Sequence, residues 1–277
     1  MIFFIPFLFI CLLLFVIVCC LLLFVCYCLI TLFAFVFYFS LSRIFMTPQD
    51  RPYIFINSAM SADGKLSTYE RKQVKISGTA DFDRVDELRA SSDAVMVGIG
   101  TMLCDNPSLT VKSEMRQKRR LEAGLCENPV RIVVDSHAKT PVDADIFKKG
   151  AGKKIIVVSE KASLDRINRL SANPETKIIV AGHDRVDLKK MAVLLKKEGI
   201  DRLMVEGGGT LNFGLIHAGI VDELKVFVGN LVIGGKNAPT FADGGGFSEI
   251  NLKKLALQSF EVIGEGILLT WKIDNGY

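Results

Sequence analysis

The chain has 277 residues, a formal net charge of +4 and a hydrophobic fraction of 50%. So small an excess of positive charge argues against nucleic acid as a partner, because that binding depends on a strongly basic surface. Beyond residue 45 the only cysteines are Cys104 and Cys126, which show no CxxC or CxxH spacing. Neither a disulfide framework nor a zinc site is therefore predicted, and a reducing compartment is favoured.

Residues 1–45 form an apolar tract in which Arg43 is the only charged residue. A bilayer-spanning helix needs about 20 apolar residues, and this tract is about twice as long. It has neither the basic leader nor the small-residue cleavage site of a signal peptide. Taken at face value it predicts a membrane anchor of one or two spans. Arg43 and Arg51 at its C-terminal end would then keep the remainder of the chain in the cytoplasm.

The segment Met46-Thr47-Pro48-Gln49-Asp50 looks instead like the natural beginning of a soluble protein. We therefore expect two regions. Residues 1–45 are expected to be an extension that is no part of the functional protein, and residues 46–277 one cytoplasmic domain. At roughly 230 residues, the second region is long enough to bury a sizeable core.

In the second region, short apolar runs alternate with segments of helical periodicity. The expected strands are Tyr53–Ser58, Ala94–Gly98, Val130–Asp135, Lys154–Ser159, Lys177–Ala181 and Leu203–Val205. The expected helices are Asp81–Ala90, Ser163–Leu170 and Leu188–Lys197. This alternation predicts an α/β fold with a largely parallel sheet and helices on both faces. At the end of the chain, Glu223–Gly229, Phe260–Ile263 and Ile267–Ile273 predict antiparallel strands that close the sheet.

The first candidate site residue in chain order is Lys65, which ends the segment NSAMSADGK from Asn57. An Asp-Gly turn after the first strand carries this lysine. A lysine beside such a turn is more often solvated than catalytic, so both interpretations stay open at this point.

A second candidate segment, VGIGTMLCDNPSLT, runs from Val97 to Thr110. Its glycines open a turn, Thr101 is placed to cap a short helix, and Asp105-Asn106-Pro107 ends that helix. A capped helix followed by an Asx-Pro turn accounts for this segment taken alone. The basic tract Lys112–Arg120 comes next, and we expect it to be a solvated loop or helix face.

The segment RLMVEGGGTLNFG, from Arg202 to Gly214, carries the most informative functional signal. A buried strand leads into Gly207–Gly209 and then into a helix, so backbone N–H groups and the helix N-terminus can bind an anion. Glu206, at the carboxyl end of the strand, faces the crevice where open α/β sheets bind ligands. The hypothesis is a phosphate-bearing ligand beside a carboxylate. The alternative is that the glycines serve only close helix–sheet packing.

Several ordered segments together resemble the riboflavin-pathway reductases, which have a dihydrofolate-reductase-like fold and use NADPH. The segments are NSAMSADGKL from Asn57, ISG from Ile76, LRASSDAVMVGIGT from Leu88, DNPSLT from Asp105, RIVVDS from Arg131 and VEGGGTLN from Val205. Bacterial relatives fuse this reductase to a zinc deaminase with H-x-E and P-C-x-x-C motifs. This sequence has neither motif, and its histidines are isolated, at His137, His183 and His217. The chain therefore resembles the stand-alone archaeal and fungal branch.

The resemblance implies roles residue by residue. For the cofactor, NADPH with NADH as the alternative, it implies contacts from Thr101, Asp105, Ser136, Gly207, Gly208, Gly209 and Thr210. For the substrate it implies Ser77, Arg89, Leu109 and Lys112. Lys112 stands where relatives often carry arginine, which keeps a cation but loses the bidentate fork. Lys65 and Glu206 match the residues that line the ribose, no metal is implied, and relatives suggest a homodimer.

The implied reaction converts the ribosylamino group of 2,5-diamino-6-ribosylamino-4(3H)-pyrimidinone 5′-phosphate into a ribitylamino group. The nicotinamide supplies the hydride, so the protein must orient the substrate and move protons, for which Lys65 and Glu206 are the candidates. Which of the two donates the proton stays open.

Other functions also stay open. One is reduction of the deaminated uracil phosphate. A dihydrofolate reductase would share the fold, but EGGG together with DNPSLT favours the ribityl-forming branch. From a different class, the chain could be a membrane-tethered nucleotide-binding protein without catalysis, although a pure binder needs neither Lys65 nor Glu206.

Overall fold

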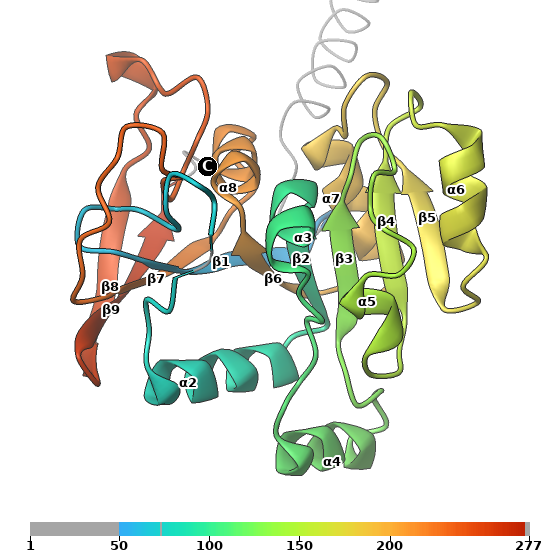
Figure 1. The fold of residues 1–277 in the computed structure, drawn as a ribbon, viewed down its shortest axis with the longest axis horizontal. Coiled ribbons are helices and arrows are strands. Elements are labelled where there is room, and N and C mark those ends of the chain that lie inside the picture. The colour runs from blue at the N-terminus through green and yellow to red at the C-terminus, as the bar shows by residue number, and fades with distance from the viewer. Residues whose placement is uncertain (1–49, 73, 275–277) are drawn as a thin grey trace, which may run out of the picture. The chain divides into compact units, whose positions relative to one another are not determined.

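Within the described residues the strands form one nine-stranded sheet, in the order β5-β4-β3-β2-β6-β1-β7-β9-β8 (Figure 1). The computed structural model describes residues 50–72 and 74–274, and Asp50–Tyr277 forms a compact unit of its own. The apolar tract at residues 1–45 and the boundary expected at residue 46 lie outside the described residues. In the part of the chain that is described, no helix combines the length and the apolar character needed to cross a bilayer.

The strands are β1 (Tyr53–Met60), β2 (Ala94–Gly98), β3 (Val130–Val134), β4 (Lys154–Val158), β5 (Thr176–Val180), β6 (Arg202–Gly207), β7 (Glu223–Val228), β8 (Leu255–Ile263) and β9 (Gly266–Ile273). The helices are α2 (Thr79–Ala90), α3 (Ile99–Asp105), α4 (Glu114–Glu122), α5 (Asp145–Lys148), α6 (Leu164–Ser171), α7 (Leu188–Lys197) and α8 (Gly209–His217), with a 3-10 turn at Glu249–Asn251. Strands β1 to β7 pair in parallel, and β8 and β9 form an antiparallel hairpin. The predicted fold class is therefore confirmed.

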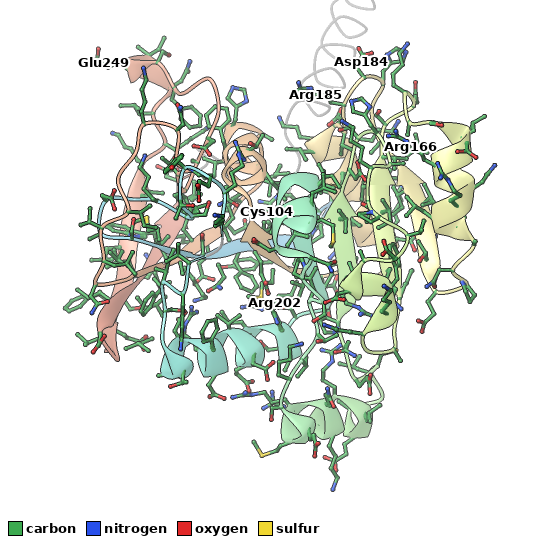
Figure 2. The ribbon with its side chains drawn as sticks, viewed as in Figure 1. Cys104, Arg166, Asp184, Arg185, Arg202 and Glu249 are labelled. Atoms are coloured by element: carbon green, nitrogen blue, oxygen red, sulfur yellow. The ribbon has the colours of Figure 1, made fainter. Side chains whose placement is uncertain are left out.

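Because β1 to β7 are parallel, their carboxyl ends lie at one edge of the sheet, and the loops that leave these ends lead into the following elements. The loop between β5 and α7 carries the exposed residues Asp184 and Arg185 at this edge (Figure 2). Loops at such an edge are where a sheet of this kind presents its ligand-binding groups.

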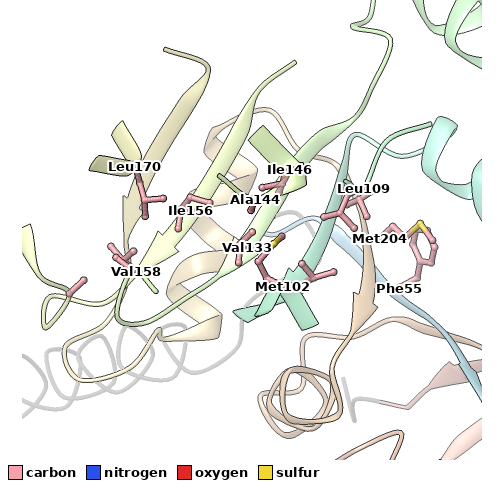
Figure 3. Packing of buried hydrophobic residues seen from close by; sticks show 14 residues of the cluster. Phe55, Met102, Leu109, Val133, Ala144, Ile146, Ile156, Val158, Leu170 and Met204 are labelled. Atoms are coloured by element: carbon pink, nitrogen blue, oxygen red, sulfur yellow. The ribbon is translucent and has the colours of Figure 1, made fainter. Parts of the chain in front are cut away.

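The central strands are apolar on both faces because helices cover each side of the sheet. On one face, Val133 and Ile156 of neighbouring strands belong to a buried cluster that also contains Met102 of α3 and Ile146 of α5 (Figure 3). On the other face, α7 contacts β5, and α8 contacts β2 and β6. Burial on both faces explains why these strands read as continuous apolar runs in the sequence.

Some details differ from the sequence-based expectations. Strand β7, expected to be antiparallel, pairs in parallel with β1 and antiparallel only with β9. The reason is that α8 forms a crossover between β6 and β7, and such a crossover returns the chain in the same direction. Strand β8 begins at Leu255 instead of Phe260, because a register shift after Leu257 breaks the alternation of side chains.

Helix α3 also differs from its prediction at one end. It ends at Asp105, as expected, but its N-cap is Gly98. Thr101 therefore lies inside the helix and does not cap it, and its hydroxyl lies 3.4 Å from the carbonyl oxygen of Gly207 instead. This contact links α3 to the glycine turn after β6.

Candidate active site

A cavity of about 1890 Å³ opens at the carboxyl ends of the central strands. It is lined by Gly98 at the end of β2, Ser136 after β3 and Glu206 in β6. Helix α2 contributes Asp86 and Arg89 to its wall. Among the described residues, no group of three or more His, Cys, Asp or Glu side chains could hold a metal ion. The lining offers backbone groups, cations such as Arg89 and single carboxylates such as Asp86.

The cavity brings together most of the site residues predicted from the sequence. Its lining includes Ser77, Arg89, Thr101, Asp105, Lys112, Ser136, Glu206, Gly208, Gly209 and Thr210. Lys65, Leu109 and Gly207 are not among the lining residues. The individual roles stay predictions, because a position in a cavity does not identify what binds there.

The glycine turn between β6 and α8 has a conformation that requires glycine. Gly207 and Gly208 have φ angles of 95° and 93°, in the left-handed region that other residues rarely adopt. A Cβ atom at Gly208 would lie 2.9 Å from Thr101 Oγ1, and one at Gly209 would lie 2.3 Å from the carbonyl oxygen of Thr240. Backbone atoms therefore form the cavity wall at Gly208 and Gly209.

The start of α8 presents unpaired N–H groups beside this turn. The amides of Gly209, Thr210 and Leu211 have no hydrogen-bond partner within residues 50–72 and 74–274, and the amide of Asn212 is the first to donate within the helix, to Gly208. A helix start of this kind carries a partial positive charge and binds anions. Gly209, Thr210 and Leu211 all line the cavity. The residues present therefore fit the phosphates of a dinucleotide.

Arg89 of α2 and Glu206 of β6 form a bidentate ion pair in the cavity wall. Arg89 Nε donates to Glu206 Oε1 at 2.5 Å and Nη2 donates to Oε2 at 2.7 Å. Arg89 Nη1 also donates to the carbonyl oxygen of Thr110 at 3.1 Å. Burial lowers the pKa of the Arg89 guanidinium, but the carboxylate of Glu206 outweighs this and raises the pKa above its ordinary value. Arg89 is therefore a permanent cation whose direction is set by Glu206.

Lys112 is a second cation of the cavity, and its surroundings favour an anionic ligand. Its Nζ donates to Thr110 Oγ1 at 2.8 Å and to Ser108 Oγ at 3.0 Å. No carboxylate pairs with it in the described part of the chain. Burial, followed by the nearby cations Arg89 and Lys149, lowers the pKa of Lys112. A bound anion would supply the missing counter-charge.

Lys65 and Leu109 lie outside the cavity lining for different reasons. Lys65 follows the turn after β1, and its Nζ donates to the carbonyl oxygen of Ala238 at 3.4 Å. Its neighbour Leu66 does line the cavity, so Lys65 lies at the border. Leu109 as a whole residue is 1% exposed and belongs to the core cluster, so in this structure it is packed away from the cavity.

Arg116 lines the cavity although the sequence analysis did not select it. The basic tract folds as α4, and Arg116 on this helix pairs with Asp83, Asp86 and Glu87 of α2 at 2.7, 3.1 and 2.9 Å. These acids recur at helical spacing along one face of α2. That spacing was the signal in the sequence that a basic partner had to lie opposite. Asp135 and Arg185 also line the cavity without having been selected. Asp135 belongs to the RIVVDS segment, whereas no local pattern marks Arg185.

Residues 52–269 match the family described as the RibD C-terminal domain. The 2,5-diamino-6-ribosylamino-4(3H)-pyrimidinone 5′-phosphate reductase of Archaeoglobus fulgidus is 45% identical over 226 residues, which cover 81% of this chain and 100% of that protein. The protein of the same name from Methanothermobacter thermautotrophicus is 40% identical over 224 residues, which cover 80% of this chain and 99% of that protein.

Solved structures share the fold at lower identity. A pyrimidine reductase-like protein from Corynebacterium diphtheriae superposes with a TM-score of 0.69 at 18% identity, covering 82% of this chain and 94% of that chain. A riboflavin biosynthesis reductase from Saccharomyces cerevisiae gives a TM-score of 0.60 at 20% identity, covering 81% of this chain and 91% of that chain. The matching profile extends over nearly the whole described domain, so the chain belongs to the RibD C-terminal domain family.

Proposed function

We propose that this protein reduces the ribosylamino group of 2,5-diamino-6-ribosylamino-4(3H)-pyrimidinone 5′-phosphate to a ribitylamino group with NADPH, in riboflavin biosynthesis. The observation that carries the proposal is one cavity with two binding features. The backbone at Gly208 and Gly209 fits phosphates. Glu206, two residues before Gly208 in the chain, lies at the end of β6 and pairs with Arg89 of α2. The archaeal relatives named for this reaction align over nearly their whole length.

The cofactor site of this proposal is built mainly from backbone. When bound, reduced nicotinamide supplies a hydride to C1′ of the ring-opened sugar. Gly208, Gly209 and Thr210 would hold the pyrophosphate at the start of α8, and Gly207 gives the turn its shape. Thr101, Asp105 and Ser136 are the proposed side-chain contacts to the same cofactor. A side chain at Gly208 would fill the space that the pyrophosphate needs.

The substrate phosphate is proposed to bind at Lys112. This cation lacks a carboxylate partner among the described residues, and Arg89 and Lys149 lie close enough to lower its pKa. A phosphate placed there would be attracted by several positive charges and by the hydroxyl groups that now accept from Lys112 Nζ. Ser77 lines the same cavity and is the proposed polar contact to the substrate, and Leu109 is the remaining substrate position that the resemblance to the family implies.

The proton transfers at the sugar are proposed for Glu206 and Lys65. Glu206 lies near the end of β6 and Lys65 follows β1. These strands are adjacent and parallel, so both residues belong to the same edge of the sheet. Glu206 already lines the cavity, where it can fix the ribose hydroxyls or relay a proton. Lys65 must turn away from the carbonyl oxygen of Ala238 to hydrogen-bond or protonate the leaving ring oxygen.

The same enzyme is proposed to be a homodimer that pairs through β8. This strand is at the edge of the sheet, and its residues Leu257, Phe260 and Val262 are 48%, 68% and 75% exposed. They share one face with Ile267, which pairs with Val262. An exposed edge strand of this kind can pair with a second copy around a two-fold axis. Replacing Phe260 and Val262 with glutamate should give a monomer in analytical ultracentrifugation, whereas an unchanged dimer would place the interface elsewhere.

The experiment that tests the reaction uses a chain that starts at Met46, without the apolar tract. We expect it to be soluble, as a cytoplasmic domain is, and to oxidise NADPH only when the diamino-ribosylamino-pyrimidinone phosphate is present. Asp50–Tyr277 is a compact unit, and the Archaeoglobus relative spans only the matching region. Equal or faster turnover of the deaminated uracil phosphate would contradict the substrate. An insoluble short chain beside a full chain that is active in membranes would contradict the assignment of residues 1–45 as dispensable.

A further inference from the structure

A second group of polar and basic side chains lines the cavity away from the glycine turn. Ser136, His137 and Lys139 follow β3, and Arg185 follows β5. Strand β3 is two positions from β6 in the sheet, with β2 between them. Because neighbouring strands lie about 4.8 Å apart, the end of β3 is roughly 10 Å from the end of β6. A ligand with phosphates at the start of α8 can therefore extend to this group.

The loop that carries Arg185 is held firmly against the ends of β3 and β4. The amide of Val186 donates to Ser136 Oγ at 3.0 Å. Ser159 Oγ donates to the carbonyl oxygen of Ser136 at 2.7 Å and lies 3.3 Å from that of Asp184. Since Ser136 Oγ accepts a hydrogen bond from the loop, its own proton is free to be donated to a ligand.

The backbone of this loop bends sharply where the chain leaves β5. Gly182 has a φ angle of 90°, and a Cβ atom there would lie 2.3 Å from the carbonyl oxygen of Arg185. The bend brings the backbone of Arg185 close to Gly182 at the end of β5. The exposed side chain of Arg185 is labelled in Figure 2, next to Asp184.

The turn after β3 is equally well fixed, and its one carboxylate is used internally. Asp135 is 1% exposed. It accepts from the amide and the hydroxyl of Thr140, both at 2.7 Å, and from the amide of His137 at 3.3 Å. Its charge is therefore compensated by the turn, and the side chains that the turn presents outward are those of His137 and Lys139.

The acids next to Arg185, Asp184 and Asp187, are not among the residues that line the cavity. Asp184 lies 3.2 Å from His183 Nδ1, and Asp187 accepts from the first amides of α7 at 3.0 Å. In the residues that the structure describes, neither Lys139 nor Arg185 pairs with a carboxylate. This end of the cavity therefore offers two cations and a hydroxyl group, while the nearby acid of the lining, Asp135, is hydrogen-bonded within its own turn.

We infer that Arg185, with Lys139 and Ser136, binds the 2′-phosphate of the adenosine ribose and makes this protein select NADPH over NADH. The inference rests on the proposed function, because it assumes that a nicotinamide dinucleotide occupies the cavity. Arginine binds a phosphate group through two hydrogen bonds. In sheets that bind dinucleotides, an acid beside the ribose favours the 2′-hydroxyl of NADH, whereas an arginine accommodates the 2′-phosphate. Here the available groups are cationic.

The test is equilibrium binding of NADPH and NADH to the purified full-length protein, followed by calorimetry or by cofactor fluorescence. We expect Arg185→Gln to weaken NADPH binding about 10- to 100-fold, which corresponds to the loss of a hydrogen-bonded charge. NADH binding should change by less than about two-fold. Lys139→Gln should act in the same direction. Arg166→Gln is the matched control, because Arg166 is exposed on α6 and outside the cavity lining (Figure 2).

The outcomes separate this inference from the function on which it rests. Equal affinity of the unmodified protein for the two cofactors would overturn the inference and leave the reductase assignment intact. An equal loss of both affinities in Arg185→Gln would show that Arg185 supports the loop and does not bind the phosphate. Absence of binding to either cofactor would overturn the proposed function itself. Added salt should reduce the preference for NADPH, because the pairing groups are exposed.

Discussion

Arg89 and Glu206 are separated by 117 positions in the chain, yet their side chains meet in a bidentate ion pair. The sequence analysis assigned the two residues different roles, Arg89 as a contact to the substrate and Glu206 as a residue that lines the ribose. The pairing joins these roles. Since Arg89 occupies one lone pair on each oxygen of Glu206, a sugar hydroxyl must use the remaining acceptor sites of the carboxylate. A substitution of either residue is therefore expected to change the orientation of the other side chain as well.

Glu206→Gln should lower kcat at least ~10²-fold while NADPH affinity stays nearly unchanged, because general acid–base help is typically worth ~10²–10⁴-fold. The substitution also leaves Arg89 without its counter-charge, so the free energy of unfolding should fall by about 1–3 kcal/mol. Steady-state kinetics at saturating substrate and urea unfolding measure the two effects separately.

The matched variant for this pair is Arg89→Lys, which keeps the charge but not the bidentate fork. Combined with Glu206→Gln, it forms a double-mutant cycle that reports how strongly the pair is coupled. A kcat within a few-fold of the parent in Glu206→Gln, together with the loss of stability, would reduce Glu206 to a structural partner of Arg89.

Gly208→Val should abolish tight NADPH binding in a protein that still folds. The φ angle of 93° at Gly208 disfavours any side chain, and its Cβ atom would approach Thr101 Oγ1 to 2.9 Å. The side chain would also enter the space required by the pyrophosphate. Circular dichroism and NADPH titration check the prediction, with Gly78→Ala as control because a Cβ atom there meets nothing within 4 Å. NADPH binding that merely follows the folded fraction would favour the packing role of the glycines.

Lys65→Met should lower kcat at least ~10²-fold with NADPH affinity nearly intact, if Lys65 turns into the cavity to assist proton transfer. Lys72→Met is the control, because Lys72 belongs to the same loop but pairs with Glu70 at the surface and is not among the cavity residues. Equal kinetics of the two variants would leave Lys65 as a turn lysine that bonds to Ala238.

The stability contributed by Asp63 should disappear in acid. Its carboxylate accepts from the Ser61 hydroxyl, then from the amides of Ile233 and Gly234, and these bonds lower the pKa of Asp63 to about 2. An unfolded aspartate titrates near pKa 3.9, so the contribution is fully present above about pH 4 and is lost as the pH falls toward 2. Urea unfolding of the protein and of Asp63→Ala should therefore show a difference that shrinks in this range. A difference that does not depend on pH would mean that the ionised carboxylate is not responsible.

Much of the domain was predictable from the sequence because it depends on local patterns. Apolar runs located the strands β1 to β6, since burial on both faces demands continuous hydrophobic residues. The glycines after β6 and the helix periodicity behind them indicated the turn that is proposed to bind phosphate, because such a turn needs only a few consecutive residues. The place of Glu206 at the end of a strand, and the family resemblance for Thr101 and Ser136, selected three residues that line the cavity.

Contacts between distant segments were decided only in the tertiary structure. Strand β6 lies between β1 and β2, and this order brings Glu206 to Arg89, which no local pattern indicates. The same is true of Arg185, whose neighbour Val186 donates its amide to Ser136 Oγ and so joins the loop after β5 to the end of β3. The parallel direction of β7 likewise depends on the crossover through α8. Short-range patterns determine which residues are buried and which form turns. The order of the strands is set by the packing of the whole sheet, and this order assembles the site.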